Sequence, residues 1–169
     1  HSGTSSTKIH TVVDIRNGIV RSEFAMEFGW HGVGVLRIEA FVDRNSNAIR
    51  LRLSQDRMPG AVRLCVEKQQ DGMDASIPPA QVIRTDDRHG VVTQTIPAGY
   101  GQKAFRWCLA GAFPAGGRVV AQVYRLWQAL ELQAGQTGEF VVGVATDRDG
   151  KGNAMRRARV LAGETTAIT

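Results

Sequence analysis

The chain has 169 residues, of which 43% are hydrophobic and 22% charged, and its formal net charge is +5. This length suits one domain, and the composition excludes a chain that is disordered throughout. No apolar stretch is long enough to span a bilayer, which excludes a transmembrane segment. Nineteen glycines and a weak helical periodicity indicate many turns and short strands.

The first residues of the chain contain no apolar signal core. We therefore expect residues 1–8 to form a flexible leader, an expression remnant or the start of a processed chain. Residues 9–169 are expected to form a single β-sandwich domain.

Alternation of apolar and polar residues predicts the strands of the first half. Asn17-Gly18 separates two β-prone runs, residues 9–16 and 19–30, and predicts a type I′ hairpin. Further strands in this half are expected within residues 32–43, 49–53 and 62–66.

The second half predicts short strands separated by glycine turns of the kind seen in Ile96-Pro-Ala-Gly99. They are expected at residues 81–85, 91–96, 103–110, 118–126, 140–145 and 155–161. Residues 123–133 fit both a helix and a strand, and we favour a strand because the preceding residues are β-prone. The fold class is therefore all-β, a single antiparallel sandwich of jelly-roll or immunoglobulin-like type with about 9–11 strands.

The apolar faces of these strands predict the core. It is expected to contain Phe24, Met26, Phe28, Trp30, Leu36, Ile38, Val42, Leu51, Leu64, Phe105, Trp107 and Val142.

The two cysteines lie on strand faces that they share with arginine. Cys65 alternates with Leu64 and Val66, and Cys108 alternates with Trp107 and Leu109. Buried cysteine usually lies among apolar residues, so these two are expected to pair as a disulfide across neighbouring strands, with two free thiols as the alternative. A disulfide would indicate a secreted, periplasmic or virion-surface location.

A glycine-rich loop carries alternating carboxylates and resembles the opening of a calcium loop. Its candidate ligands are Asp147, Asp149 and Asn153. The loop has no distant bidentate glutamate, so a hairpin turn is the favoured interpretation, and the sequence predicts neither a metal nor a cofactor.

Two groups of basic residues are candidates for binding an anionic polymer or glycan, because arginine suits carboxylate and phosphate recognition. Arg50 and Arg52 lie on outward strand faces. The second group surrounds the last predicted hairpin and consists of Arg148, Lys151, Arg156, Arg157 and Arg159. Alternatively, outward arginines form a cross-strand ladder with acidic residues, in which Arg21, Arg37 and Arg63 pair with Glu23, Glu39 and Glu67.

Gly29-Trp-His-Gly32, followed by the alternating residues 35–42, resembles a segment of the capsid jelly rolls of picorna-like viruses. The resemblance covers about fifteen residues and implies a long core strand after a Trp-x-Gly step. It also implies a shell subunit that binds copies of itself.

Two functions follow from the sequence. The first is a non-catalytic recognition module that binds an anionic or saccharide partner through an arginine-rich surface. The alternative is a self-assembling structural subunit, such as a virus or phage capsid-like or surface-layer protein. Catalysis has little support, because the histidines are isolated and no serine or cysteine lies in a nucleophile-elbow motif.

Overall fold

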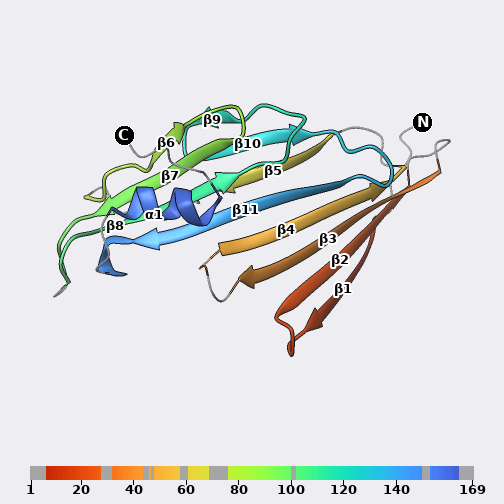
Figure 1. Cartoon of the computed structure of the whole chain (residues 1–169), viewed down its shortest axis with the longest axis horizontal. Helices are drawn as coiled ribbons and strands as arrows, with labels where there is room; N and C mark the ends of the chain where they lie inside the picture. Colours follow the sequence, from red (N-terminus) through yellow and green to blue (C-terminus); the bar gives the residue numbers. More distant parts are fainter. Residues whose placement is uncertain are drawn as a thin grey trace.

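The computed structural model describes residues 7–27, 32–43, 46, 48–57, 61–68, 76–99, 102–149 and 153–163. Within these residues the chain forms eleven strands, one 3-10 helix and one α-helix (Figure 1). The all-β prediction is confirmed. The elements are β1 (Thr7–Asp14), β2 (Ile19–Glu27), β3 (Val33–Asp43), β4 (Ala48–Asp56), β5 (Val62–Glu67), β6 (Gln81–Arg84), β7 (His89–Ile96), β8 (Phe105–Ala112), β9 (Val120–Gln122), β10 (Arg125–Leu130), β11 (Thr137–Thr146), η2 (Asp147–Asp149) and α1 (Ala154–Leu161).

Eight strands form one antiparallel sheet in the order β1-β2-β3-β4-β11-β8-β7-β6, and β5-β10-β9 form a second. Strands β1 to β4 follow one another as hairpins, and β11 then brings the end of the chain beside β4. Strands β1, β2 and β3, the N-terminal wing, lie at one end of the large sheet and away from the small sheet (Figure 1).

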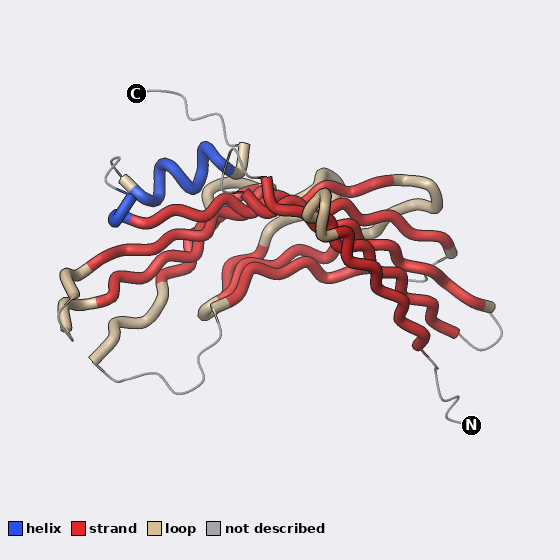
Figure 2. Tube along the Cα trace, turned by 90° about the horizontal axis from the view of Figure 1, so that it is seen from below, coloured by secondary structure: helices blue, strands red, loops and turns tan. Residues whose placement is uncertain are grey.

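The core lies where the small sheet covers one face of the large sheet (Figure 2). Its centre includes Phe113 and Phe140, whose ring centroids are 4.6 Å apart. The buried members are Leu53, Leu64, Val66, Val92, Phe113, Val119, Leu126, Leu130, Leu132, Phe140 and Val142.

Helix α1 covers the opposite face of β8 and β11, so this half of the molecule has three layers (Figure 2). Small residues let the helix approach the sheet closely, because a Cβ on Gly143 would lie 2.8 Å from the Ala162 backbone nitrogen. The buried layer consists of Ala48, Val91, Cys108, Ala110, Ala112, Val141, Ala145, Ala154, Ala158 and Ala162.

The prediction of a strand at 155–161 is wrong, because these residues form α1. Asn153 caps the helix, and its side-chain oxygen accepts hydrogen bonds from the backbone N–H groups of Met155 and Arg156. Ala154, Ala158 and Ala162 are spaced four residues apart, which places them on one helical face against the sheet.

The predicted hairpin at Asn17-Gly18 exists, but its turn type is wrong. A type I′ turn needs positive φ at both central residues, and here Gly18 has φ 66° whereas Asn17 does not have a positive value. Asp14 shapes a longer turn instead, since its carboxylate accepts from both the backbone and the side chain of Asn17. Strand β1 begins at Thr7, so Thr7 and Lys8 belong to the sheet although they fall within the leader expected at residues 1–8.

The predicted strand at 118–126 is divided into β9 and β10 by a turn at Val123 and Tyr124. Tyr124 has φ 72°, a left-handed conformation that no glycine or asparagine in the sequence signals here. Within residues 123–133, where we favour a strand over a helix, only Arg125–Leu130 form one, β10, and the turn interrupts the predicted continuation from the preceding strand.

The core prediction holds where the small sheet covers the large one. Leu36, Leu64 and Val142 are buried, and Ile38, Leu51 and Trp107 pack at the margin of the core. Val42 is 60% exposed, and its assignment to the core is wrong because its strand continues into the uncovered wing. The half-buried residues outside the core cluster are Phe24, Met26 and Phe105. Phe28 and Trp30, with most of the Gly29-Trp-His-Gly32 segment, lie outside the described residues.

Candidate functional site

The predicted disulfide is contradicted, because Cys65 and Cys108 are both free. Cys65 is exposed on β5 of the small sheet, whereas Cys108 is buried on the face of the large sheet that α1 covers. The core therefore separates them. Burial raises the pKa of each thiol above its ordinary value. Without the disulfide, the prediction of an extracytoplasmic location loses its basis.

The calcium-loop candidate has a different local structure. Asp147 and Asp149 begin and end η2, and the Asn153 oxygen is occupied in capping α1. In the described part of the chain, no group of three or more potential metal-ligating side chains is found. Nothing helical in that part has the length and apolarity that crossing a bilayer requires.

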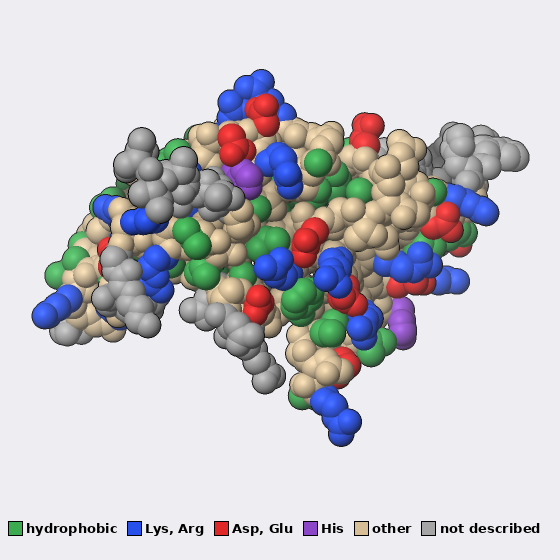
Figure 3. Space-filling view, viewed as in Figure 1, with side chains coloured by type: hydrophobic (Ala, Val, Ile, Leu, Met, Phe, Trp, Pro, Cys, Tyr) green, Lys and Arg blue, Asp and Glu red, His purple; other side chains and the backbone are tan. Residues whose placement is uncertain are grey.

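The outward arginines of the large sheet are engaged with acidic side chains from neighbouring strands. Arg50 lies 3.4 Å from Glu139, and Arg52 lies 3.7 Å from Glu39. Arg21 also pairs with Glu39, at 2.8 Å. Figure 3 shows basic and acidic side chains interspersed over the end of the molecule that β1 to β4 form in the view of Figure 1. The alternative of a cross-strand ladder of arginine and acidic residues therefore describes these strands. On β5, Arg63 instead stacks over the Trp127 ring at 4.7 Å.

The second basic group is only partly brought together. Arg148 lies 4.0 Å above the Phe105 ring and donates to Gln102 at 2.7 Å. Arg157 donates to the Thr146 carbonyl at 3.4 Å, while Arg156 is exposed on α1. Arg159 is half-buried on the same helix. Lys151 lies outside the described residues.

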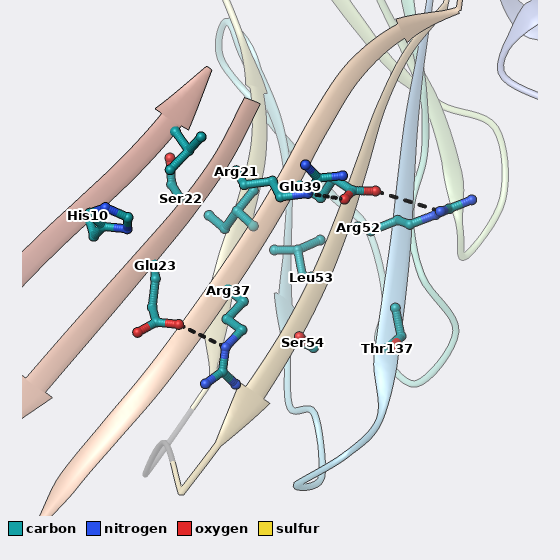
Figure 4. Close-up of a pocket in the computed structure, with 12 residues that line it drawn as sticks. His10, Arg21, Ser22, Glu23, Arg37, Glu39, Arg52, Leu53, Ser54 and Thr137 are labelled. Carbon is teal, nitrogen blue, oxygen red and sulfur yellow. Dashed lines mark hydrogen bonds and ion pairs between the residues drawn. The ribbon is translucent and has the colours of Figure 1, made fainter. Parts of the chain in front are cut away.

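A hollow of about 480 Å³ lies beside the charged ladder, between β1 and β11. Figure 4 shows Glu23 joined to Arg37, and Glu39 joined to both Arg21 and Arg52. An anion entering the hollow would have to compete with these carboxylates. The lining residues are His10, Val12, Arg21, Ser22, Glu23, Arg37, Ile38, Glu39, Arg52, Leu53, Ser54 and Thr137.

A second hollow, of about 820 Å³, lies near the C-terminal end of α1. Its basic side chains have partners: Arg88 donates to the Phe113 carbonyl at 3.0 Å, and His89 contacts Asp86 at 2.8 Å. Burial raises the pKa of Asp86, but hydrogen bonds from Arg88 and His89 outweigh it and lower the pKa below its ordinary value. This hollow has mixed charge, since Glu131 and Glu139 also line it.

The core face of the large sheet continues into the wing without a cover. Leu51, at the core margin, pairs with Ala40, which pairs with Val20, which in turn pairs with Val13. Directly opposed residues share one face, so this apolar row runs on from the core, and the polar pair Thr11–Ser22 separates it from a second apolar row that ends at Ile9. We call its exposed members the wing patch: Ile9 (63% exposed), Val13 (59%), Val20 (37%), Val42 (60%) and Ile49 (39%). Strand periodicity predicted this apolar face, but not that it would be exposed.

Strand β1 is the outermost strand of the wing, and its residues are exposed except for the half-buried Asp14. Among the described residues, no strand pairs with its outer side.

Comparison of the chain with protein-family models and with curated proteins finds no match.

Proposed function

We propose that the chain is a structural subunit that self-assembles through its N-terminal wing. The observation that carries this proposal is the wing patch, an apolar face continuous with the core of the large sheet. Contiguous exposed apolar surface in a folded protein is typical of an interaction site. The class that we propose is a shell or surface-layer subunit. The jelly-roll subtype of its fold stays a prediction.

The alternative, recognition of an anion through the sheet arginines, has less support. Arg50 and Arg52 face Glu139 and Glu39, and Arg148 is stacked on Phe105. A polyanion would have to displace these partners before it gained new contacts. The wing patch has no such competitor among the described residues.

We expect Val13→Lys to dissociate the assembly, because it places a charge in the wing patch at a residue that is 59% exposed. The matched control is Val123→Lys, since Val123 is 73% exposed in the turn between β9 and β10. Light scattering should give a mass near 18.4 kDa for Val13→Lys and the wild-type mass for the control. Both variants should melt within a few degrees of the wild type, because exposed substitutions usually change stability by less than about 0.5 kcal/mol. Equal masses for Val13→Lys and an oligomeric wild type would refute the wing as the interface.

A second candidate function is binding of an anionic glycan or polymer by α1. The described helix carries Arg156, Arg157 and Arg159 and no acidic residue. Positive charge of this density favours polyanions.

We expect Arg156→Ala to elute from heparin at lower salt than the wild type, because one exposed cationic contact is lost. Arg52→Ala is the control, since Arg52 is already opposed by Glu39. Salt-gradient elution measures both variants. Indistinguishable elution of Arg156→Ala and the wild type would remove α1 as the binding surface.

A further inference from the structure

The outer edge of β1 differs from the other edges of the two sheets. Strand β1 has 8 residues, whereas the edge strands β6 and β9 have 4 and 3. The remaining edge strand, β5, has 6 residues and carries Arg63 and Glu67. Natural sheets protect edges by short length, charge, proline or bulges. Strand β1 has no proline and an uninterrupted ladder with β2, and its charged residues Lys8 and Asp14 lie near its two ends, so among the described residues the outer edge between them is open for pairing.

We propose that a second copy of this chain pairs with β1 in antiparallel orientation, around a two-fold axis through Thr11. The two large sheets then become one continuous sheet. This inference rests on the proposed self-assembly and names the partner, the edge and the register. An isologous contact of this kind uses the same surface on both copies and closes as a dimer.

Symmetry restricts the register. A two-fold axis perpendicular to the sheet keeps the same face of both copies on the same side, so directly opposed residues must share a face. Ile9, Thr11 and Val13 face the core side, and Lys8, His10 and Asp14 face the other. An axis at Thr11 meets this condition and opposes Ile9 to Val13 of the second copy.

The same register also matches charge. It opposes Lys8 to Asp14 of the second copy, and symmetry repeats this pair at the other end of the contact. Hydrogen bonds from Asn17 lower the pKa of Asp14, so its carboxylate is ionised at neutral pH. Opposite charges across strands stabilise the pair, and like charges destabilise it.

The neighbouring registers fit less well. An axis at His10 opposes the two imidazoles and places Lys8 against Val12. An axis at Val12 opposes Ile9 to Ile15, which lies in the turn after β1 and is 86% exposed. Only the axis at Thr11 combines the Ile9–Val13 contact with the Lys8–Asp14 pair.

The test uses cysteine at the axis. In a Cys65→Ser background, which removes the exposed thiol, Thr11→Cys should form a disulfide-linked dimer under mild oxidation. Opposed Cβ atoms in an antiparallel pair lie about 4.5–5.5 Å apart, close to disulfide geometry. Val13→Cys in the same background is the control, because its two copies lie four positions apart, about 13 Å along the strand. Mixing Ile9→Cys with Val13→Cys should restore cross-linking between the two variants.

The outcomes separate this inference from the proposed function. Efficient dimer from Thr11→Cys, little from Val13→Cys, and cross-linking in the mixture support the register. An oligomeric chain in which Thr11→Cys forms no more dimer than Val13→Cys leaves self-assembly standing but overturns pairing through β1. A monomeric chain at all concentrations overturns both.

Discussion

Phe113→Ala is expected to lower the free energy of unfolding by about 3–5 kcal/mol. Phe113 is 0% exposed, and its ring lies 4.6 Å from that of Phe140, between the two sheets. A Cβ on Gly111 would lie 2.9 Å from the Phe113 ring, so the strand beneath is shaped to this side chain. Chemical denaturation measures the change.

The control for this variant is Phe105→Ala. Phe105 is half-buried outside the core cluster, and one face of its ring is covered by Arg148 at 4.0 Å. Its truncation should cost less than about 2 kcal/mol. This corrects the sequence-based assignment of Phe105 to the core. Equal losses for the two variants would mean that the small sheet does not seal the core at Phe113.

Gly143→Ala is expected to lower the free energy of unfolding by about 1–3 kcal/mol and to loosen α1 from the large sheet. The added Cβ would collide with the Ala158 carbonyl oxygen and lie 2.8 Å from the Ala162 nitrogen. These are backbone atoms of the last turn and end of the helix, so they move only if the helix moves. Denaturation and thiol accessibility measure the effect.

Cys108 reports on the helix directly, because it belongs to the buried layer beneath α1. In a Cys65→Ser background, Gly143→Ala should make Cys108 react faster with a thiol reagent. Gly99→Ala is the control, since a Cβ there meets nothing within 4 Å. Unchanged reactivity of Cys108 in Gly143→Ala would show that the helix tolerates the added methyl group without moving.

Strand periodicity predicted the ladder through β1 to β4, because alternation depends only on neighbouring residues in the chain. It could not distinguish Leu36, which is buried, from Val42, which is 60% exposed. Both alternate in the same strand. Their burial differs because the small sheet covers one part of the large sheet and not the other, and this depends on contacts between distant segments.

The helix α1 was missed for a related reason. Its buried face consists of small alanines, which carry little hydrophobic signal, and its other positions are rich in arginine. The disulfide prediction is wrong for the same reason. Cys108 does lie on the face of its strand opposite to Trp107 and Leu109, as predicted. However, α1 covers that face, and Cys65 belongs to the other sheet.

The binding candidates show the same division between local and long-range information. The outward positions of Arg50 and Arg52 follow from alternation, but their acidic partners come from β11 and β3. Pairing across distant strands decides whether an outward arginine is available to a ligand. The wing patch is the complementary case, where a face predicted to be covered is exposed.

The most direct test of the central claim is the solution mass of the wild-type chain across a range of concentrations, measured by light scattering. Assembly through the wing predicts a mass of at least twice 18.4 kDa at high concentration that falls toward 18.4 kDa on dilution. A mass of 18.4 kDa at every concentration would contradict self-assembly of this chain.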